Sequence, residues 1–268
     1  MEPSRAKDRK AGDQTRQRIL DVAERAFILQ GFDALSLRQI TEQAQVNLAA
    51  VHYHFGGKEA LLHAMLERRI GKLNTERLRL LDACEAAWPE APLSCEHVLA
   101  AMFVPALRLA RDPQQGGPAF LRLLGRVYTD TSPAVATYLR QHYEPVFDRF
   151  FDAFVRALPH MPRQDLGLRL HFSLKALAGV LASDDIEQLI ASFSQGQAFT
   201  EAQLLTRLIS LMVAVLKEPL LHTQRSATLE EVLRMADLQG GKRPQALRVL
   251  NGGKSSVMPP RRTRTPRR

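Results

Sequence analysis

Three hydrogen-bonding rings stand side by side in the stretch VNLAAVHYHFGGKEALLH, which covers residues 46–63. His52, Tyr53 and His54 carry ring nitrogens and a hydroxyl group, and Lys58 follows them after a pair of glycines. Side chains of these types form hydrogen bonds with the edges of nucleic-acid bases and with phosphate oxygens. Three adjacent residues cannot all face one way on a helix, so some would reach bases and others phosphates. The stretch is typical of a short helix that contacts DNA.

The same rings could instead bind a metal ion or fill a core. His52 and His54 are two residues apart, whereas zinc ligands on one face of a helix are spaced as in the i, i+4 pair of a metalloprotease helix. We therefore predict no metal site and no cofactor. A helical histidine that only packs or faces solvent remains the simpler alternative for each ring.

The pattern around these rings predicts two helices joined by a short turn. Ser36 is expected to begin a helix over residues 36–44, and Gln39 completes a capping-box pattern with it. Asn47 is a suitable N-cap for a second helix over residues 48–54. In the helix-turn-helix geometry the second helix lies in the major groove and the first crosses the DNA backbone.

Small and charged residues flank the rings. Ala49 and Ala50 keep the leading face of the second helix small, and their methyl groups suit contact with thymine. Lys58 starts the next helix, where exposed backbone N–H groups attract anions. We expect Lys58 to face a DNA phosphate.

The rest of the chain also has helical periodicity, and no stretch alternates with a period of two. We therefore predict an all-α fold, in which an N-terminal three-helix domain precedes a larger helical domain. Helices are expected over about residues 14–30, from 58 into the high seventies, and over 94–111, 118–128, 133–158, 163–182, 200–217 and 228–238. Residues 183–199 receive no assignment.

Positive charge is concentrated at the C-terminal end. The net charge is +9, and residues 240–268 hold nine lysines and arginines without an acidic residue, so the remaining chain is neutral. We expect a disordered tail, and the alternative is a tail that is attracted to nucleic-acid phosphate. Cys84 and Cys95 form neither a disulfide framework nor a metal motif. Without a signal peptide or an apolar run of the roughly 18–20 residues that span a membrane, we expect a cytoplasmic protein with no membrane partner.

Residues 15–66 resemble the N-terminal domain of TetR-family transcriptional regulators. The matching residues are Thr15, Ile19, Leu20, Ala23, Phe27, Gly31, Phe32, Leu37, Ile40, Ala44, Val46, Val51, Tyr53, His54, Phe55, Lys58, Glu59, Leu61 and Leu62. The resemblance implies a double-stranded DNA operator as partner, with base contacts from Arg38, Ala49, Ala50 and His52 and phosphate contacts from Ser36, Tyr53, His54 and Lys58. The full expected interface comprises Ser36, Leu37, Arg38, Asn47, Ala49, Ala50, His52, Tyr53, His54 and Lys58. The family often has other residues at Asn47, Leu48, Ala50 and His52, so a different operator sequence is expected.

The family resemblance also implies a dimer and a ligand. TetR-like proteins form homodimers through their last two main helices and bind a small molecule between the middle ones. Apolar stripes that permit this lie at Leu170, Leu174, Leu177 and Leu181, and at Leu204, Leu205, Leu208, Met212, Val215 and Leu216. The alternative is that both stripes belong to the core of a monomer.

A phenylalanine-rich stripe from Phe147 to Phe154 suggests the wall of an apolar ligand cavity. The alternative is that these side chains only pack in the core. Cations near it, namely Arg122, Arg126, His142, His171 and Lys175, would suit an amphipathic anion. Segments 119–128, 138–154 and 169–181 are similar to the PsrA-type, fatty-acid-responsive branch of the family. The ligand-binding residues expected on these grounds are Phe103, Phe120, Leu124, Tyr128, His142, Phe147, Phe150, Phe151, His171 and Lys175.

Together these features predict a repressor of lipid or fatty-acid metabolism genes. A long-chain fatty acid or acyl-CoA would release it from a palindromic operator. The alternatives are a regulator of efflux or of aromatic or drug response genes, and a DNA-binding architectural protein without a ligand. No catalytic residue is predicted, because GxSxG and HExxH are missing and the P-loop-like NGGKSS has Arg248 where the first glycine is required. The expected domains are a disordered arm (1–13), the DNA-binding domain (14–60), the ligand-binding and dimerisation domain (61–220), a possible extra helix (221–239) and the basic disordered tail (240–268).

Overall fold

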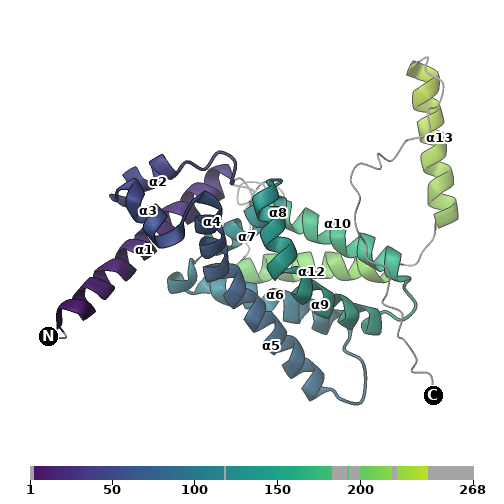
Figure 1. Cartoon of the computed structure of the whole chain (residues 1–268). Coiled ribbons are helices and arrows are strands. Elements are labelled where there is room, and N and C mark those ends of the chain that lie inside the picture. The colour runs from purple at the N-terminus through teal and green to yellow at the C-terminus, as the bar shows by residue number, and fades with distance from the viewer. Residues whose placement is uncertain (1–2, 118, 183–191, 193–199, 219–221, 241–268) are drawn as a thin grey trace, which may run out of the picture. The chain divides into compact units, whose positions relative to one another are not determined.

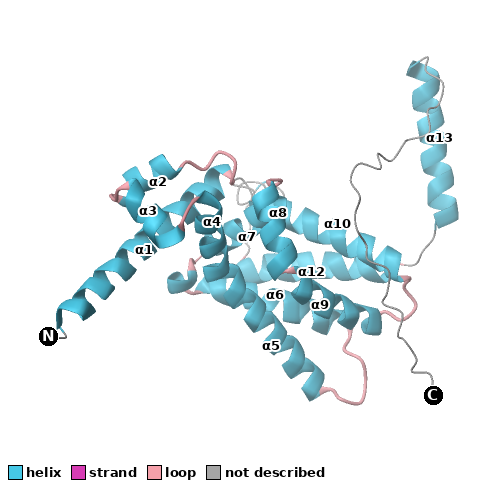
Figure 2. Ribbon diagram, in the orientation of Figure 1, coloured by secondary structure: helices cyan, strands magenta, loops and turns pink. Residues whose placement is uncertain are grey.

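The structure is a computed structural model, which describes residues 3–117, 119–182, 192, 200–218 and 222–240 (Figure 1). Every regular element in these ranges is helical, which confirms the predicted fold class (Figure 2). The chain forms two compact units, residues 1–218 and 219–268, and each is described by itself. The unassigned stretch 183–199, apart from Ser192, and the basic tail beyond Gly240 lie outside the described residues.

The helices of the first unit are α1 (Pro3–Gln30), α2 (Leu37–Ala44), α3 (Leu48–Phe55), α4 (Lys58–Leu66), a π-helical turn (Glu67–Gly71), α5 (Lys72–Ala87), α6 (Cys95–Arg111), a 3-10 turn (Pro113–Gln115), α7 (Ala119–Thr129), α8 (Pro133–His142), α9 (Glu144–Ala157), α10 (Arg163–Ala182) and α12 (Glu201–Lys217). The predicted helices over 163–182 and 200–217 are confirmed. None of the helices in the described ranges has the length and apolar character needed to cross a membrane.

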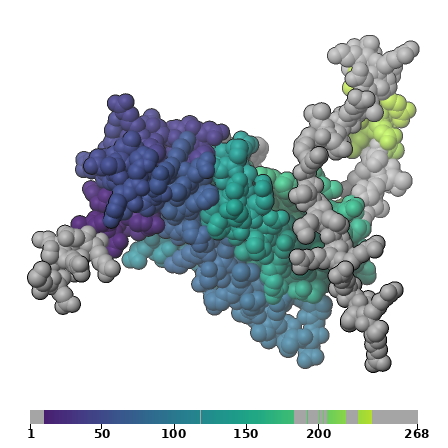
Figure 3. All heavy atoms as spheres, in the orientation of Figure 1, coloured from purple at the N-terminus to yellow at the C-terminus, as the bar shows by residue number. Residues whose placement is uncertain are grey.

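The first three helices pack on one apolar cluster, to which α4, α7 and α8 also contribute buried side chains. Ile19, Leu20 and Phe27 of α1 are fully buried, and so are Ile40 of α2 and Val51 of α3. Burying a side chain of this size contributes about 1.5–3 kcal/mol, so the cluster fixes how α2 and α3 lie on α1. In the space-filling view these helices are the purple-to-blue part of the surface (Figure 3). We call α1, α2 and α3 the head.

Helix α1 begins earlier than predicted. Residues 1–13 were expected to form a disordered arm, but α1 starts at Pro3 and continues without interruption. Most residues between Ala6 and Asp13 cost little in a helix, and lengthening an existing helix costs less than starting one. The prediction of a disordered arm is therefore wrong for residues 3–13.

The helix predicted from Lys58 into the high seventies is divided in the middle. Helix α4 ends at Leu66, a π-helical turn covers Glu67–Gly71, and α5 continues to Ala87. A Cβ atom at position 71 would collide with the carboxylate of Glu67, and glycine avoids this collision because it has no Cβ. The Glu67 carboxylate also accepts a hydrogen bond of 3.1 Å from the hydroxyl of Tyr138 in α8. The wide turn therefore ties the α4–α5 segment to α8.

The helix predicted over 133–158 is two helices, α8 and α9, with Tyr143 between them. Pro145 lies in the first turn of α9. Proline has no backbone N–H and its ring clashes with the preceding turn, so it favours a new start over a continuous helix. The prediction of one helix is wrong at this point.

A second apolar cluster lies among α5, α6, α9, α10 and α12. Leu81, Val98, Phe150, Leu170 and Leu216 are among its buried members. Helix α10 also packs closely on α7. A Cβ atom at Gly125 of α7 would lie 2.5 Å from the backbone nitrogen of Ala182, so only glycine permits this approach.

The second unit contains α13 (His222–Gly240), which covers the extra helix predicted over 221–239. Leu229, Val232 and Leu233 on this helix are exposed.

Candidate functional site

Helices α2 and α3 are joined by a tight turn. Gln45 ends α2 in the left-handed conformation, with φ 53° and ψ 49°, and its backbone N–H donates to the carbonyl of Glu42 at 3.2 Å. The N–H of Val46 donates to the carbonyl of Thr41 at 3.0 Å. These bonds satisfy the last carbonyls of α2 and turn the chain directly into α3.

Both ends of α3 are fixed by local bonds. The side chain of Asn47 accepts a hydrogen bond of 2.8 Å from the backbone N–H of Ala50, which confirms the predicted N-cap. At the other end, Gly56 has φ 85° and its N–H donates to the carbonyl of His52 at 2.9 Å. The expected cap at Ser36 is wrong in one respect, because its side chain makes no cap hydrogen bond with α2.

The helix α3 turns one side inward and the other toward solvent. Val51 is fully buried, whereas Ala49, His52 and Tyr53 are exposed, Tyr53 to 85%. Ala50 is partly buried and packs against the core cluster of the head. Of the predicted interface, the structure brings Ala49, His52 and Tyr53 together on one open face.

The rings on this face are held without losing their hydrogen-bonding groups. The Nδ1 atom of His52 lies 3.2 Å from the carbonyl oxygen of Gly56. The other ring nitrogen, Nε2, is the one that can bind a base edge. The rings of Tyr53 and His54 meet edge to face, with centroids 5.0 Å apart. Such an arrangement can present a donor or an acceptor to a base edge in a groove.

Two predicted cationic contacts also bind within the chain. Lys58 donates to the carbonyl of Asp33 at 3.2 Å, and its ammonium group lies 4.4 Å from the ring centroid of Phe32. Arg38 pairs with Glu42 at 3.3 Å, and both side chains are largely exposed. Lys58 thus also fixes the α1–α2 connection.

The remaining members of the predicted interface lie at the edges of this region. Ser36 and Leu37 are partly buried at the start of α2, and Asn47 is exposed at the start of α3. The sequence reasoning missed Arg16 of α1, whose guanidinium lies 5.3 Å from the ring centroid of Phe55. Only a fold that places α1 beside the end of α3 reveals this residue.

The head is attached to the following helices through ion pairs. Glu24 of α1 is buried, and its carboxylate binds Arg68 at 2.5 Å and Arg69 at 2.8 Å. Arg68 also binds Asp21 at 2.7 Å. Both arginines belong to the π-helical turn, so this turn carries the main charged contacts with α1.

A second attachment runs from α7 to the end of α1. The side chain of Asp130 accepts a hydrogen bond of 3.1 Å from the backbone N–H of Phe32. Arg126, expected near a ligand, instead donates to the carbonyl of Ile28 at 3.0 Å. Arg126 therefore positions the head.

The ten residues predicted to bind a ligand do not form one group. Phe120 and Leu124 of α7 are buried in the first cluster, which the head shares with α4, α7 and α8, whereas Phe103 and Phe150 are buried in the second cluster. His171 is exposed, and Lys175 donates to the carbonyl of Tyr128.

Other members of that prediction do come together. Tyr128 contacts Tyr143, and Tyr143 contacts Phe147, which stacks on Phe151 at a centroid distance of 5.9 Å. His142 stacks on the neighbouring Tyr138.

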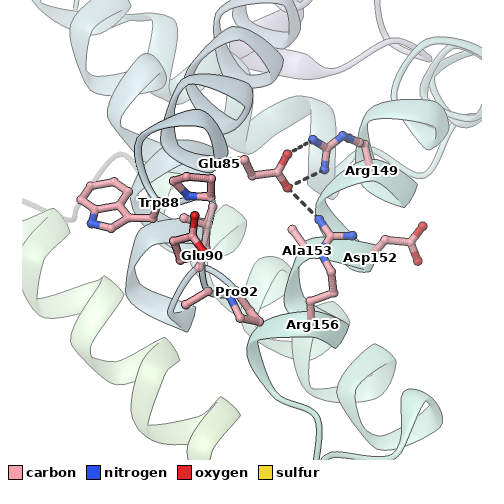
Figure 4. A pocket seen from close by; sticks show the side chains of 11 residues that line it. Glu85, Trp88, Glu90, Pro92, Arg149, Asp152, Ala153 and Arg156 are labelled. Carbon is pink, nitrogen blue, oxygen red and sulfur yellow. Dashed lines mark hydrogen bonds and ion pairs between the residues drawn. The ribbon is translucent and has the colours of Figure 1, made fainter.

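A pocket of about 570 Å³ opens between the end of α5 and α9 (Figure 4). Figure 4 shows the carboxylate of Glu85 facing both Arg149 and Arg156, with Trp88 on the opposite side. The hydrogen bond from Arg149 lowers the pKa of Glu85 below its usual range, against the effect of burial. None of the ten predicted ligand residues lines this pocket, whose lining carries the acids Glu85, Glu90 and Asp152 beside the two arginines.

Among the described residues, no group of three or more histidine, cysteine or acidic side chains could hold a metal ion. His52 and His54 of α3 remain hydrogen-bonding rings in this geometry.

The chain matches two protein-family models. The first describes bacterial regulatory proteins of the tetR family and matches residues 19–65, which include α2 and α3. The second describes the tetracyclin repressor-like C-terminal domain and matches residues 100–214.

Curated relatives match over part of the chain. The HTH-type transcriptional regulator SrpR of Pseudomonas putida is 44% identical over 57 residues, which are 21% of this chain and 27% of that protein. The HTH-type transcriptional repressor KstR of Rhodococcus jostii is 27% identical over 135 residues, 46% of this chain and 64% of that protein. The chain thus spans less than two thirds of either relative.

The chain is also similar to the solved structure of Mycobacterium smegmatis AmtR. The match covers 86% of this chain and 96% of the AmtR chain, with 17% identity and a TM-score of 0.48. The two matching family models describe the two parts of the same kind of regulator, and their 47 and 115 matched residues together exceed half of the 268. The chain belongs to the TetR family of bacterial regulatory proteins.

Proposed function

We propose that the chain is a sequence-specific DNA-binding repressor that acts as a homodimer and is released from its operator by an amphipathic ligand. The observation that carries this proposal is the open face of α3. Ala49, His52 and Tyr53 are exposed there, while Val51 anchors the same helix in the core. A helix of this kind, held by the turn after α2, fits the major groove.

Base reading is assigned to Ala49 and His52, and backbone contacts to the residues around them. Ala49 is small enough to let α3 approach base edges, and the ring of His52 offers a hydrogen-bonding nitrogen. Arg38 in the first turn of α2 would contact a base, as predicted from the sequence, whereas Tyr53 and Lys58 lie beside this face and would bind phosphates. Arg16 is added to this group because it lies at the end of α3.

Two copies are expected to join through α10 and α12. These helices pack on each other, and Arg169 of α10 donates to the carbonyl of Val215 at 2.7 Å. Large apolar side chains still face outward on both, including Phe172 at 67% and Leu211 at 62% exposure. Covering such side chains with the same surface of a second copy gives a two-fold dimer, whose half-sites would lie roughly 34–36 Å apart.

A ligand can act only if it binds the DNA-free arrangement more tightly, and couplings of about 1–3 kcal/mol are typical. The ion pairs of Glu24 and the bond from Phe32 to Asp130 give the head two attachments to the ligand-binding domain. A change in α7 or in the π-helical turn would therefore move α1. We assign the ligand to the fatty-acid class, as a carboxylate with an apolar chain, because aromatic rings follow one another from Tyr128 to Phe151.

The decisive experiment is selection of bound duplexes from a random DNA library by the purified full chain. We expect enrichment of a palindrome, and no enrichment at modest ionic strength would overturn the proposal. His52→Ala should then weaken binding to the selected palindrome roughly 5- to 150-fold, the range of one good base contact, and leave binding to unrelated DNA unchanged. His160→Ala, an exposed histidine outside the head, serves as the matched control and should bind like the wild type.

A further inference from the structure

Arg77 of α5 is a charged side chain in the middle of the larger domain. It is 2% exposed, and it lies where α5, α6, α7 and the α8–α9 junction meet. Burying a charge costs several kcal/mol unless an opposite charge or strong hydrogen bonds compensate for it. The chemistry of the groups around Arg77 therefore indicates the function of this residue.

All acceptors that reach this guanidinium are neutral. Its Nε donates to the carbonyl of Met102 at 2.9 Å, and its Nη1 donates to Asn74 at 3.4 Å and to the hydroxyl of Tyr128 at 3.3 Å. Burial, followed by the neighbouring Tyr128, raises the pKa of the Tyr143 hydroxyl, so that group stays uncharged as well. Two of the three hydrogen bonds are long compared with about 2.7–2.9 Å for a bond between opposite charges.

Arg77 is the only arginine that is buried among the residues whose burial the structure describes. The partly buried Arg126 and Arg169 also donate to backbone carbonyls, but each keeps part of its surface open to solvent. Arg68, Arg69 and Arg149 each bind a carboxylate. No ion pair between residues that the structure describes includes Arg77. The charge of Arg77 is thus left without a counter-charge from the described part of the chain.

An apolar track leads to this charge. The guanidinium lies 5.9 Å from the ring centroid of Tyr143, whose ring contacts Tyr128 at 5.2 Å and Phe147 at 6.3 Å. Phe147 stacks on Phe151 one turn farther along α9. These four rings are only partly buried, so part of each ring surface is left uncovered by the chain.

We propose that Arg77 is the receptor for the carboxylate of an amphipathic ligand whose apolar chain lies along Phe147 and Phe151. The carboxylate takes the position that the Tyr128 hydroxyl holds now, and a long hydrogen bond to a neutral acceptor is exchanged for a short one to a charged acceptor. The inference rests on the proposed function for its biological meaning. It assigns the ligand class through a residue that the sequence reasoning did not select.

Laurate and 1-dodecanol test the proposal directly, because they share a chain and differ in charge. Calorimetric titration of the full wild-type chain, without DNA, should show laurate binding about ten-fold or more tightly than dodecanol, as expected for a charged hydrogen bond. Arg77→Met should remove this preference and weaken laurate binding by a similar factor. Arg79→Met, which removes an exposed arginine of the same helix, should change neither.

Wild-type protein that fails to bind laurate, or that binds both compounds equally, would overturn the inference without any substitution. An Arg77→Met variant that keeps the preference for laurate would overturn it too. If Arg77→Met does not fold, Arg77→Lys retains the charge, and the preference for laurate is expected to persist at lower affinity. Failure of DNA selection with success of these titrations would refute the proposed repressor and leave the carboxylate site standing.

Discussion

Replacing Glu24 by glutamine removes a buried carboxylate that two guanidinium groups share. Its oxygen Oε2 lies 2.5 Å from Arg68 and 2.8 Å from Arg69, and the side chains of these arginines are only 19% and 12% exposed. Arg68 keeps its contact with Asp21 at 2.7 Å, whereas Arg69 loses its ion pair with Glu24. The substitution therefore leaves one mostly buried charge uncompensated.

The expected cost follows from this geometry. Breaking a buried ion pair by removing one partner costs about 3–5 kcal/mol, and the remaining contact of Arg68 places Glu24→Gln near the lower end, at about 3 kcal/mol. For a protein of this size each kcal/mol lowers the melting temperature by about 2–4 °C, so the midpoint should fall by about 6–12 °C.

Thermal and urea unfolding followed by circular dichroism would measure this change. Glu42→Gln is the matched control, since the pair of Glu42 with Arg38 is exposed on both sides and should contribute about 0.5 kcal/mol or less. A loss below about 1 kcal/mol for Glu24→Gln, or equal losses for both variants, would refute the reasoning that burial makes this pair important.

Two further pairs of substitutions test the packing of α7 on α10 and the cap of α3. Gly125→Ala should destabilise the chain by about 1–3 kcal/mol, because the added methyl group meets the backbone at Ala182. The control is Gly179→Ala in α10, where nothing lies within 4 Å of the new atom. It should be neutral or stabilising by up to about 1 kcal/mol. Urea midpoints decide between these results, and equal effects would contradict the close approach of α7 and α10. Asn47→Ala should cost about 1 kcal/mol through loss of the cap, whereas Ser36→Ala should change stability by only a few tenths, since Ser36 makes no cap bond; the opposite order in the same unfolding measurement would contradict the assignment.

The helix-turn-helix could be predicted because its signals are local. Asn47 caps α3 through a bond to a backbone group three residues away, and Gly56 ends the helix through its own conformation. The burial of Val51 and Ile40 follows from helical periodicity. Such features depend on neighbours in the chain, which the sequence displays directly.

The parts that could not be predicted depend on distant contacts. Lys58 binds the carbonyl of Asp33, which lies 25 residues away, and Arg126 binds Ile28 across 98 residues. The ordinary sequence pattern around Arg77 does not show that three helices and a helix junction enclose its charge. Charged side chains are read from sequence as solvent-facing, and only packing reveals that one of them is buried.

The wide turn at Glu67–Gly71 aligns side chains over a long distance. In a regular α-helix, residues four apart drift around the axis by about 40° at each step, so such a row soon winds out of the core. A π turn holds more residues and winds the row back. As a result Leu62, Leu66, Ile70 and Asn74 are all buried. This buried row begins in α4, which packs on α3, and ends at Asn74, which accepts a hydrogen bond from Arg77.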